Sequence, residues 1–543
     1  MKMDRTRIIF VVIIALGLLA TCGIISYSLI SNQLDSDTAE ATAAPGATAV
    51  SNNGQPGPET VNLDSPEPIW GPDYDPNDGL PTYVCGADAF GSYFTLQQMQ
   101  MSGLDVENGF HLGIIPFDLT DEYTVTEDQR TALLDAGQWD CLLTTLDSVA
   151  LSSPGVITAI VDESAGADQL WGRDIATIND LEDKRITFSQ GSVGEYFVYY
   201  TLNMAQLSPR SQVTLVPQDT VADAVAAFNN GQADVVSGWE PDIYDAEQSG
   251  GQPLLSSEQL RIVMDVIVTS RQTISEDPDL VQNFHNAWFA ALKNQVEDFD
   301  TAAAQIAAWG NNDWSYVYPE SASDDLALWL ENVAQADLGD NAFVMRDTRP
   351  ILQRLEIARR VWAASDVPVP NDNIEDLVNA GFVLRAADQP SLQPLADPVN
   401  DTFSISPQLD VGGISTEEAA TLAVLPCRTF TFLPESTELT LESRRILDSC
   451  VVPTLSQSIG LYLRVRGSSA WPANDPPWTE EDILEVAEGR AQSVVDYLVS
   501  QGIDPARFIV EATLPPEDHW NTDDPNIQAQ DRFVELTLVT AGR

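Results

Sequence analysis

The stretch from Lys184 to Pro241 constrains the fold more than any other, because short apolar segments alternate in it with segments of helical periodicity. We expect strands at 186–189, at 213–216 and from Val235 onward. The order strand, helix, strand, helix, strand predicts a parallel sheet, and open sheets of this kind bind ligands at the carboxyl ends of their strands. An α/β core with ordinary turns remains equally compatible with this stretch alone.

Both helices of this stretch begin at a residue that can cap them. Ser192 follows a turn that contains Gly191 and Gly194, and Thr220 precedes the second helix. The free backbone N–H groups at a helix start bind anions and carbonyl oxygens. Ser192 is therefore a candidate ligand contact.

The net charge of the chain excludes some partners. Its 543 residues, enough for several domains, carry a formal charge of −56. A surface this acidic repels nucleic acid and anionic lipid, so we expect no nucleic-acid partner. No spacing of cysteine and histidine resembles a zinc site, and we expect neither a metal nor a cofactor.

The N-terminus predicts export. Residues 8–30 carry no charge and as a helix would span roughly 34 Å, enough to cross a bilayer. Lys2, Arg5 and Arg7 precede them, which places the rest of the chain outside the cytoplasm. We expect an uncleaved transmembrane helix; a cleaved signal peptide and a lipoprotein acylated at Cys22 are the alternatives. All three make the protein extracytoplasmic, in the cell envelope.

Four further cysteines lie beyond the N-terminal segment. In an oxidising compartment, proximity along the chain favours the disulfides Cys85–Cys141 and Cys427–Cys450. Four buried thiols are the alternative interpretation.

Composition divides the chain into parts. Residues 31–76 and 386–425, rich in Pro, Ala and Ser, are expected to be linkers, the first of them disordered. Between them we expect helices at 279–309, 322–335, 347–364 and 373–380. From residue 426 onward, strands alternate with two helices, which predicts a small α/β domain.

Five motifs occur in order between residues 162 and 241. They are D-E-S-A-G-A-D at 162–168, I-N-D-L at 178–181, Q-G-S-V-G at 190–194, G-Q-A-D at 231–234 and W-E-P at 239–241. With them, residues 80–385 resemble extracytoplasmic solute-binding proteins of ABC importers, in the branch for nitrate, sulfonates, taurine and thiamine-precursor pyrimidines. The resemblance implies a two-lobed periplasmic-binding-protein fold over 77–385, with an inserted lobe at about 173–261.

The same resemblance implies the ligand contacts. They are Ser92, Tyr93, Thr144, Thr145, Asp162, Ser164, Ala165, Ser192, Val193 and Glu240. Arg173 is a cation near these motifs, and a surface position at the lobe edge is the better interpretation of it. The sequence therefore does not choose between an anion and a neutral heterocycle.

Residues 427–540 resemble the OmpA-like peptidoglycan-associated domain, a small α/β sandwich. Arg490-Ala491 matches the family's helical Arg-Ala, and D-R-F-V-E-L at 531–536 resembles its closing strand. The resemblance implies that Arg490, at the border of an apolar helix stripe, reaches outward, and that Arg490 and Arg532 are peptidoglycan-binding residues. Gly467-Ser468-Ser469-Ala470 stands where the family has Gly-His-Thr-Asp, so we expect weak wall binding unless Asp475 substitutes.

These observations predict a membrane-anchored solute-binding protein that serves an ABC permease or a sensor and associates with peptidoglycan. The alternative is a structural envelope protein whose solute lobe is degenerate. An enzyme is disfavoured, because His111, His285 and His519 are scattered and no catalytic motif occurs. We assign no catalytic residue.

Overall fold

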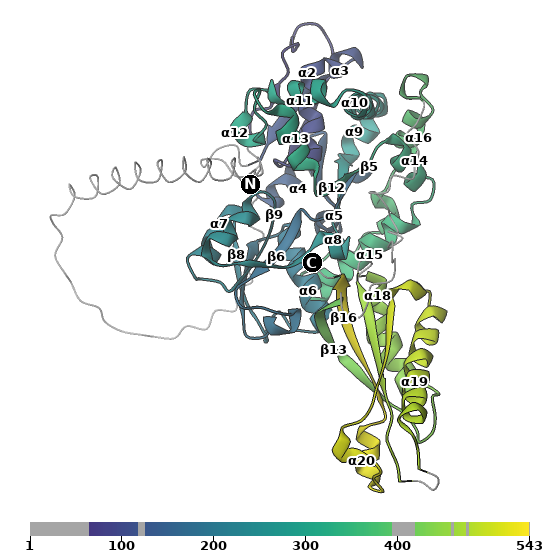
Figure 1. The fold of residues 1–543 in the computed structure, drawn as a ribbon. Coiled ribbons are helices and arrows are strands. Elements are labelled where there is room, and N and C mark those ends of the chain that lie inside the picture. The colour runs from purple at the N-terminus through teal and green to yellow at the C-terminus, as the bar shows by residue number, and fades with distance from the viewer. Residues whose placement is uncertain (1–64, 118–124, 394–418, 458–460, 474–476, 542–543) are drawn as a thin grey trace, which may run out of the picture. The chain divides into compact units, whose positions relative to one another are not determined.

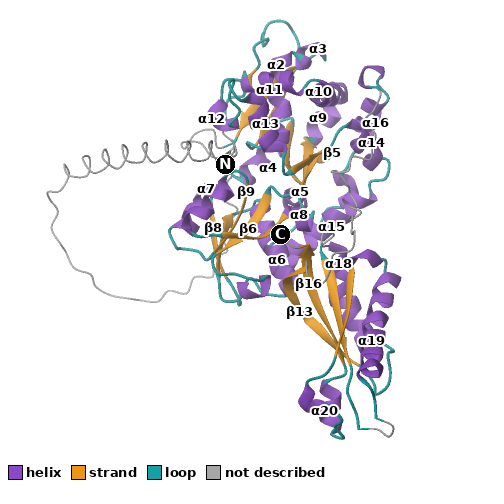
Figure 2. Ribbon diagram, in the orientation of Figure 1, coloured by secondary structure: helices purple, strands orange, loops and turns teal. Residues whose placement is uncertain are grey.

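The computed structural model describes residues 65–117, 125–393, 419–457, 461–473 and 477–541. They form three sheets with helices around them (Figure 1, Figure 2). The expected anchor at 1–30, Cys22, most of the first linker and Asp475 lie outside these residues. Within them, no helix is both long and apolar enough to cross a membrane.

The first sheet has seven strands in the order β1-β3-β2-β4-β11-β5-β12. β2 is parallel to β3 and β4, whereas β11 is antiparallel to both β4 and β5. The strands are β1 (Ile69–Trp70), β2 (Thr82–Ala87), β3 (His111–Pro116), β4 (Cys141–Thr145), β5 (Val156–Ser164), β11 (Met264–Thr269) and β12 (Val333–Gln335). The helical segments that connect its first five strands are η1 (Gly91–Phe94), α2 (Thr95–Ser102), α3 (Leu104–Glu107), α4 (Glu127–Asp135) and α5 (Leu146–Ser152).

The second sheet contains the unit expected from 184–241. It has five strands in the order β10-β6-β9-β7-β8, and β7 is parallel to both β8 and β9. The strands are β6 (Asp168–Gly172), β7 (Arg185–Ser189), β8 (Thr214–Gln218), β9 (Val235–Trp239) and β10 (Gln252–Ser256); the helical segments are η2 (Ile178–Leu181), α6 (Val193–Ala205), α7 (Val221–Asn229), η3 (Asp242–Ser249) and α8 (Ser257–Leu260). The predicted strand–helix alternation is confirmed.

The chain passes between the two sheets twice, after β5 and before β11. The inserted lobe begins at β6, so the expected start at residue 173 is too late, because Asp168–Gly172 already pairs with β9. The Ser164 and Ser257 hydroxyls are 2.7 Å apart, and Ser257 also accepts a hydrogen bond from the Gly166 N–H at 2.8 Å. These bonds tie the two crossings together.

Two expected linkers are shorter than predicted. Ile69 and Trp70 lie in the range assigned to the first linker, yet they pair with Ile114 and Gly113 of β3. Gly113 makes room for this edge strand, since a Cβ there would lie 2.9 Å from the Trp70 ring. The second linker ends earlier as well, because β13 begins at Ala419. Both segments were assigned to linkers because the surrounding sequence is rich in Pro, Ala and Ser.

The chain between β11 and residue 393 is mostly helical. One helix expected at 279–309 is two, because the Asp298 side chain accepts from the Thr301 N–H and starts a new helix. The helix expected at 322–335 ends at Leu330 and is followed by β12. The elements are α9 (Arg271–Glu276), α10 (Pro278–Glu297), α11 (Phe299–Ala307), α12 (Asn312–Ser315), α13 (Ala322–Leu330), α14 (Leu338–Met345), α15 (Arg349–Ala364), η4 (Ile374–Leu377), α16 (Gly381–Ala387) and η5 (Pro390–Leu392).

The third sheet has the order β13-β16-β14-β15, and α19 connects the parallel strands β14 and β15. Its strands are β13 (Ala419–Thr431), β14 (Tyr462–Ser468), β15 (Phe508–Thr513) and β16 (Phe533–Ala541). Its helical segments are α17 (Leu441–Ile446), η6 (Leu447–Val451), α18 (Val452–Gln457), α19 (Glu480–Ser500), η7 (Pro505–Arg507), η8 (Glu517–His519) and α20 (Pro525–Gln530). This is the small α/β domain that the sequence predicts.

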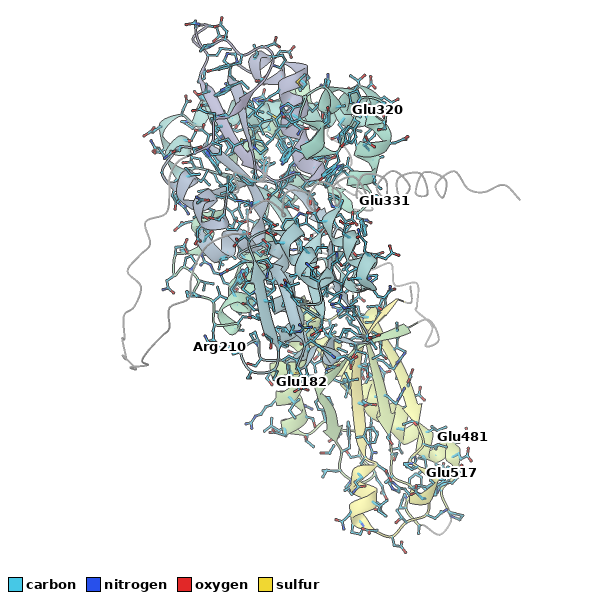
Figure 3. The ribbon with its side chains drawn as sticks, turned by 90° about the vertical axis from the view of Figure 1, so that its left-hand side faces the viewer. Glu182, Arg210, Glu320, Glu331, Glu481 and Glu517 are labelled. Carbon is cyan, nitrogen blue, oxygen red and sulfur yellow. A yellow bond between two sulfur atoms is a disulfide. The ribbon has the colours of Figure 1, made fainter. Side chains whose placement is uncertain are left out.

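The disulfide Cys85–Cys141 is present and joins the neighbouring strands β2 and β4. Cys450 is also disulfide-bonded, and the side chain of its expected partner Cys427 lies outside the described residues. Much of the acidic excess faces solvent: the glutamates labelled in Figure 3, such as Glu320, Glu331 and Glu517, are exposed.

Candidate functional site

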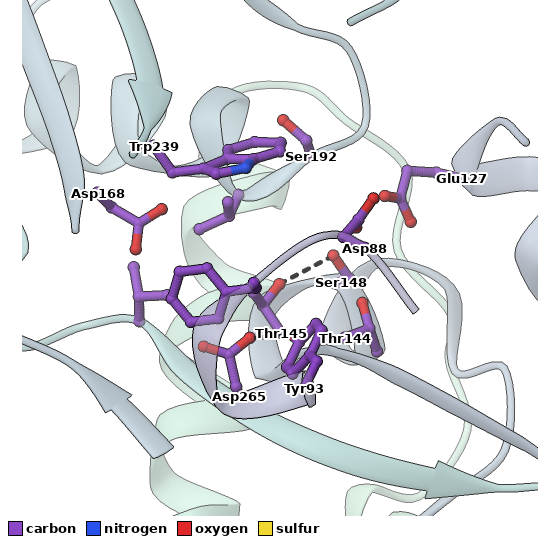
Figure 4. A pocket seen from close by; sticks show the side chains of 13 residues that line it. Asp88, Tyr93, Glu127, Thr144, Thr145, Ser148, Asp168, Ser192, Trp239 and Asp265 are labelled. Carbon is purple, nitrogen blue, oxygen red and sulfur yellow. Dashed lines mark hydrogen bonds between the residues drawn. The ribbon is translucent and has the colours of Figure 1, made fainter. Parts of the chain in front are cut away.

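A cavity lies where strands from the first and second sheets end. The carboxyl ends of β2, β4, β7 and β9 lead directly into residues of its wall (Figure 4). Its volume is about 40 Å³. This is the edge at which parallel α/β sheets bind ligands, as the sequence predicts.

The first-sheet side of the wall is polar and aromatic. β2 leads to Asp88, Phe90 and Tyr93, and β4 ends in Thr144 and Thr145. Thr145 and Ser148 share a hydrogen bond of 3.0 Å between their hydroxyls (Figure 4). The remaining residues on this side are Glu127, Val263 and Asp265.

The second-sheet side consists of Asp168, Ser192, Val193 and Trp239. Ser192 caps α6 as expected, because its hydroxyl accepts from the Gly194 N–H at 3.1 Å. Gly191, with φ of 76°, makes the turn that leads into this helix. Trp239 is the last residue of β9, and in Figure 4 its ring faces Asp265 and Thr145 from the opposite side of the cavity.

Five of the expected contacts line the cavity: Tyr93, Thr144, Thr145, Ser192 and Val193. The other five do not. Ser92 is fully buried and donates to Asp162, and Ser164 belongs to the crossing described above. The Ala165 N–H donates to the Asn332 carbonyl at 2.9 Å. These residues hold the wall in place instead of forming it.

Glu240 was also expected to contact the ligand, but its buried side chain bonds to other protein groups and does not line the cavity. It accepts from the Tyr244 hydroxyl, from the Asn332 amide at 2.7 Å and from the Gln169 amide at 3.3 Å. Burial raises the pKa of Glu240, while these donors oppose the rise. Its carboxylate is therefore held by other protein groups.

Seven residues line the cavity without having been expected there: Asp88, Glu127, Ser148, Asp168, Trp239, Val263 and Asp265. Asp168 and Trp239 belong to two of the five sequence motifs, so the motifs could have indicated that these residues line the site. Asp265 lies in β11, outside the sequence motifs. Its place in the wall follows from β11 lying between β4 and β5.

The carboxyls at the cavity have unusual environments. Burial raises the pKa of Asp168 to about 7, and the neighbouring Asp265 and Glu240 add to the rise. Burial and then the adjacent Asp162 raise the pKa of Asp265 well above its ordinary value. Burial also raises the pKa of Asp147, behind Thr145, to about 8. Each of these groups holds its proton more tightly than a carboxyl in water.

Asp88 and Glu127 are different, because Arg130 neutralises part of their charge. The Arg130 guanidinium donates to both Asp88 oxygens, at 2.8 and 3.1 Å, and to Glu127 at 2.7 Å. Its carbon Cζ also lies 3.9 Å from the centre of the Phe117 ring. Arg130 thus stands behind the wall and does not line the cavity.

Residues 156–302 match the family model described as NMT1/THI5 like. The match spans all five motifs and part of the wall, including Asp168, Ser192, Trp239 and Asp265. No curated protein sequence matches the chain significantly.

Several solved structures are similar to part of the chain. The periplasmic aliphatic sulphonate binding protein SsuA from Escherichia coli is 15% identical, with a TM-score of 0.43, over 55% of this chain and 92% of that one. The alkanesulfonate-binding protein SsuA from Xanthomonas axonopodis pv. citri is 18% identical, with a TM-score of 0.43, over 55% and 98%. The periplasmic nitrate-binding protein NrtA from Synechocystis PCC 6803 is 12% identical, with a TM-score of 0.43, over 59% and 92%.

The three histidines lie in separate places. His111 contacts Asp78 at 2.9 Å, His519 contacts Asp531 at 2.9 Å, and buried His285 contacts the Val281 carbonyl at 2.8 Å. None of them lines the cavity. Among the described residues, no group of three or more His, Cys, Asp or Glu side chains is arranged to hold a metal ion.

Arg490 does not reach outward as expected. It is 1% exposed and donates to the carbonyls of Ser436 at 3.0 Å, Ser468 at 2.9 Å and Leu433 at 3.5 Å. Burial, and then the nearby Arg532, lower its pKa to about 10. Arg490 therefore ties α19 to the ends of β13 and β14, and its role toward peptidoglycan stays a prediction.

Arg173 is also structural, since it donates to the Phe228 and Ala233 carbonyls.

Proposed function

We propose that residues 77–385 capture a small polar solute and present it to an ABC permease or to a sensor. The observation that carries this proposal is the cavity, whose polar wall comes from the strand ends of two sheets. The motifs at 162–241, which fall inside the match at 156–302, support it. A degenerate lobe would not be expected to keep hydroxyls, carboxyls and an aromatic ring converging on one space.

The solute can be found with the full chain and a library of small anions, cations, sulfonates and pyrimidines. A ligand at about 100 times its Kd adds roughly 2.7 kcal/mol of stability, which a thermal shift detects. Ser192→Ala should weaken the shift, because Ser192 lines the cavity and starts α6. Thr220→Ala is the matched control, since Thr220 caps α7 in the same way and does not line the cavity. A shift that both variants leave unchanged would place the solute elsewhere.

We also propose that the chain is held in the cell envelope by residues 8–30 and that residues 426–543 associate weakly with peptidoglycan. The uncharged N-terminal run and the resemblance of the last domain support these two points. Protease added to intact spheroplasts should digest the chain from about residue 31 onward. Co-sedimentation of the chain with purified peptidoglycan should be weak and should strengthen in Ala470→Asp. Full protection from protease, or no sedimentation of either form, would contradict the respective point.

A further inference from the structure

Every charged side chain on the described wall of the cavity is a carboxyl. The four are Asp88, Glu127, Asp168 and Asp265, and no Lys, Arg or His is among the lining residues. Figure 4 shows that they do not sit on one side: Asp168, Asp265 and the Asp88–Glu127 pair surround the space. Acidic groups therefore lie on several sides of the cavity, and no basic side chain lies among its lining residues.

The general acidity of the chain does not explain this wall. Surface carboxyls remain in water, whereas Asp168 and Asp265 are only 5% and 3% exposed. Burying a carboxylate is costly unless a cation or several donors compensate. Within the described part of the chain, neither carboxyl forms an ion pair: Arg130 pairs with Asp88 and Glu127, and Arg261 and Arg354 pair with Glu163. Two buried carboxyls thus face the cavity without a counter-ion.

The other wall groups complement the carboxyls. Trp239 presents an aromatic ring, and Phe90 and Tyr93 form an edge-to-face pair with ring centres 5.5 Å apart. Aromatic faces attract cations, and Trp does so most strongly. Hydroxyls of Thr144, Thr145, Ser148 and Ser192 can accept hydrogen bonds beside the carboxyls. A group that is cationic, partly apolar and rich in N–H donors would satisfy all three kinds of wall residue.

We propose that the solute is a small organic cation, an ammonium or amidinium compound whose charged group lies between Trp239 and the carboxyls of Asp168 and Asp265. This inference rests on the proposed solute-binding function and names its substrate class. It separates this chain from the sulphonate- and nitrate-binding proteins reported above, whose named ligands are anions.

One alternative uses the same residues. If Asp168 and Asp265 kept their protons, they could donate hydrogen bonds to an anion or to a neutral solute. The pH dependence separates the two cases. The groups around these carboxyls, Asp147, Asp162 and Glu240, are acidic too. A cation therefore binds by displacing a proton and binds more tightly as pH rises, whereas an anion held by protonated acids binds less tightly.

The test uses the full chain in 150 mM NaCl and probes matched in shape. Guanidinium and nitrate are both planar ions with threefold symmetry but carry opposite charges. The compounds n-propylammonium, n-propanesulfonate and propan-1-ol share one alkyl chain and differ in the charge of the end group. Ligand-observed NMR should show binding of guanidinium and propylammonium at the cavity and none of nitrate or propanesulfonate. Because the pKa of Asp168 is about 7, cation affinity should rise about tenfold from pH 6 to pH 8.

Substitutions in the cavity wall test whether the cation binds there. Asp168→Asn and Trp239→Ala should each weaken cation binding about tenfold or more, while Asp279→Asn, which removes an exposed carboxyl, should leave it unchanged. Binding of nitrate, propanesulfonate or propanol that Trp239→Ala abolishes would overturn the cation assignment and leave the solute-binding function standing. Absence of cavity binding by guanidinium and propylammonium would overturn the cation assignment alone, because the solute library tests the solute-binding function separately. Should a variant fail to fold, the pH dependence of the unaltered chain still decides between cation and anion.

Discussion

Asp265 and Asp162 lie directly opposite each other on the paired strands β11 and β5, and both carboxyls are buried. The Tyr93 hydroxyl donates to Asp265 and the Ser92 hydroxyl to Asp162. Two adjacent carboxyls in the interior cannot both ionise at low cost, so at least one proton is held between them. This pair supports one edge of the cavity, because Asp265 and Tyr93 both line it.

The carboxyl pair should make the protein less stable as pH rises. Burial raises the pKa of both groups in the folded state, so the folded chain binds more protons than the unfolded chain above about pH 4. Stability from these protons is complete below the unfolded pKa and is lost as pH rises through the folded pKa. Asp162→Asn, which mimics the protonated acid, should flatten the fall in unfolding free energy between pH 5 and pH 8. Urea unfolding at both pH values measures this, with Asp279→Asn as the control; an unchanged slope would show that Asp162 ionises freely.

The two helix caps of the second sheet should contribute similar stability. Ser192 accepts from Gly194 N–H at 3.1 Å, and Thr220 accepts from Asp223 N–H at 3.1 Å. Replacing either by Ala removes the acceptor and should lower the free energy of unfolding by about 1 kcal/mol. Equilibrium urea unfolding checks the size of each effect. A loss near zero in either variant would mean that water replaces the cap without cost.

Gly467 should not tolerate a side chain. A Cβ at this position would lie 1.9 Å from the Ala487 carbonyl oxygen, because α19 crosses β14 closely there. Gly467→Ala should therefore unfold the C-terminal domain or force α19 away from the sheet. Gly489→Ala is the contrast on the same helix: its Cβ would lie 3.0 Å from the Thr437 methyl, so this side chain must shift slightly, and Ala favours helix by up to about 1 kcal/mol. Circular dichroism melts of both variants compare them, and equal melting temperatures would contradict the prediction.

Arg490→Ala should destabilise the C-terminal domain whether or not it binds the wall. The change would leave the Ser436 and Ser468 carbonyls without their donor, at a cost of roughly 2–4 kcal/mol. Hydrogen exchange of strands β13 to β16 in the full chain should accelerate. Arg445→Ala removes an exposed guanidinium and should change exchange little. Unaltered protection in Arg490→Ala would show that water satisfies these carbonyls.

Much of the local structure could be predicted because its causes lie within a few residues. The strand–helix alternation of 184–241 and the caps at Ser192 and Thr220 follow from apolar spacing and side-chain chemistry. The pairing of Cys85 with Cys141 was also expected, and the parallel neighbours β2 and β4 bring these cysteines together. Short segments without periodicity, such as Ile69–Trp70 and β12, were missed because only their partner strands make them strands.

The sequence by itself determined the α/β alternation and the strand ends at which a ligand site would form. Only the tertiary structure decided which side chains face that site. Asp168 lies in β6 of the second sheet and Asp265 in β11 of the first, and they line the same cavity although they are far apart along the chain, which no local pattern encodes. The same holds for Arg490: its helix stripe was visible in the sequence, but the carbonyls that draw its guanidinium inward come from distant loops and strand ends. Local propensity determines where helices and strands form. Contacts between distant parts of the chain determine which way each side chain points and which groups it contacts.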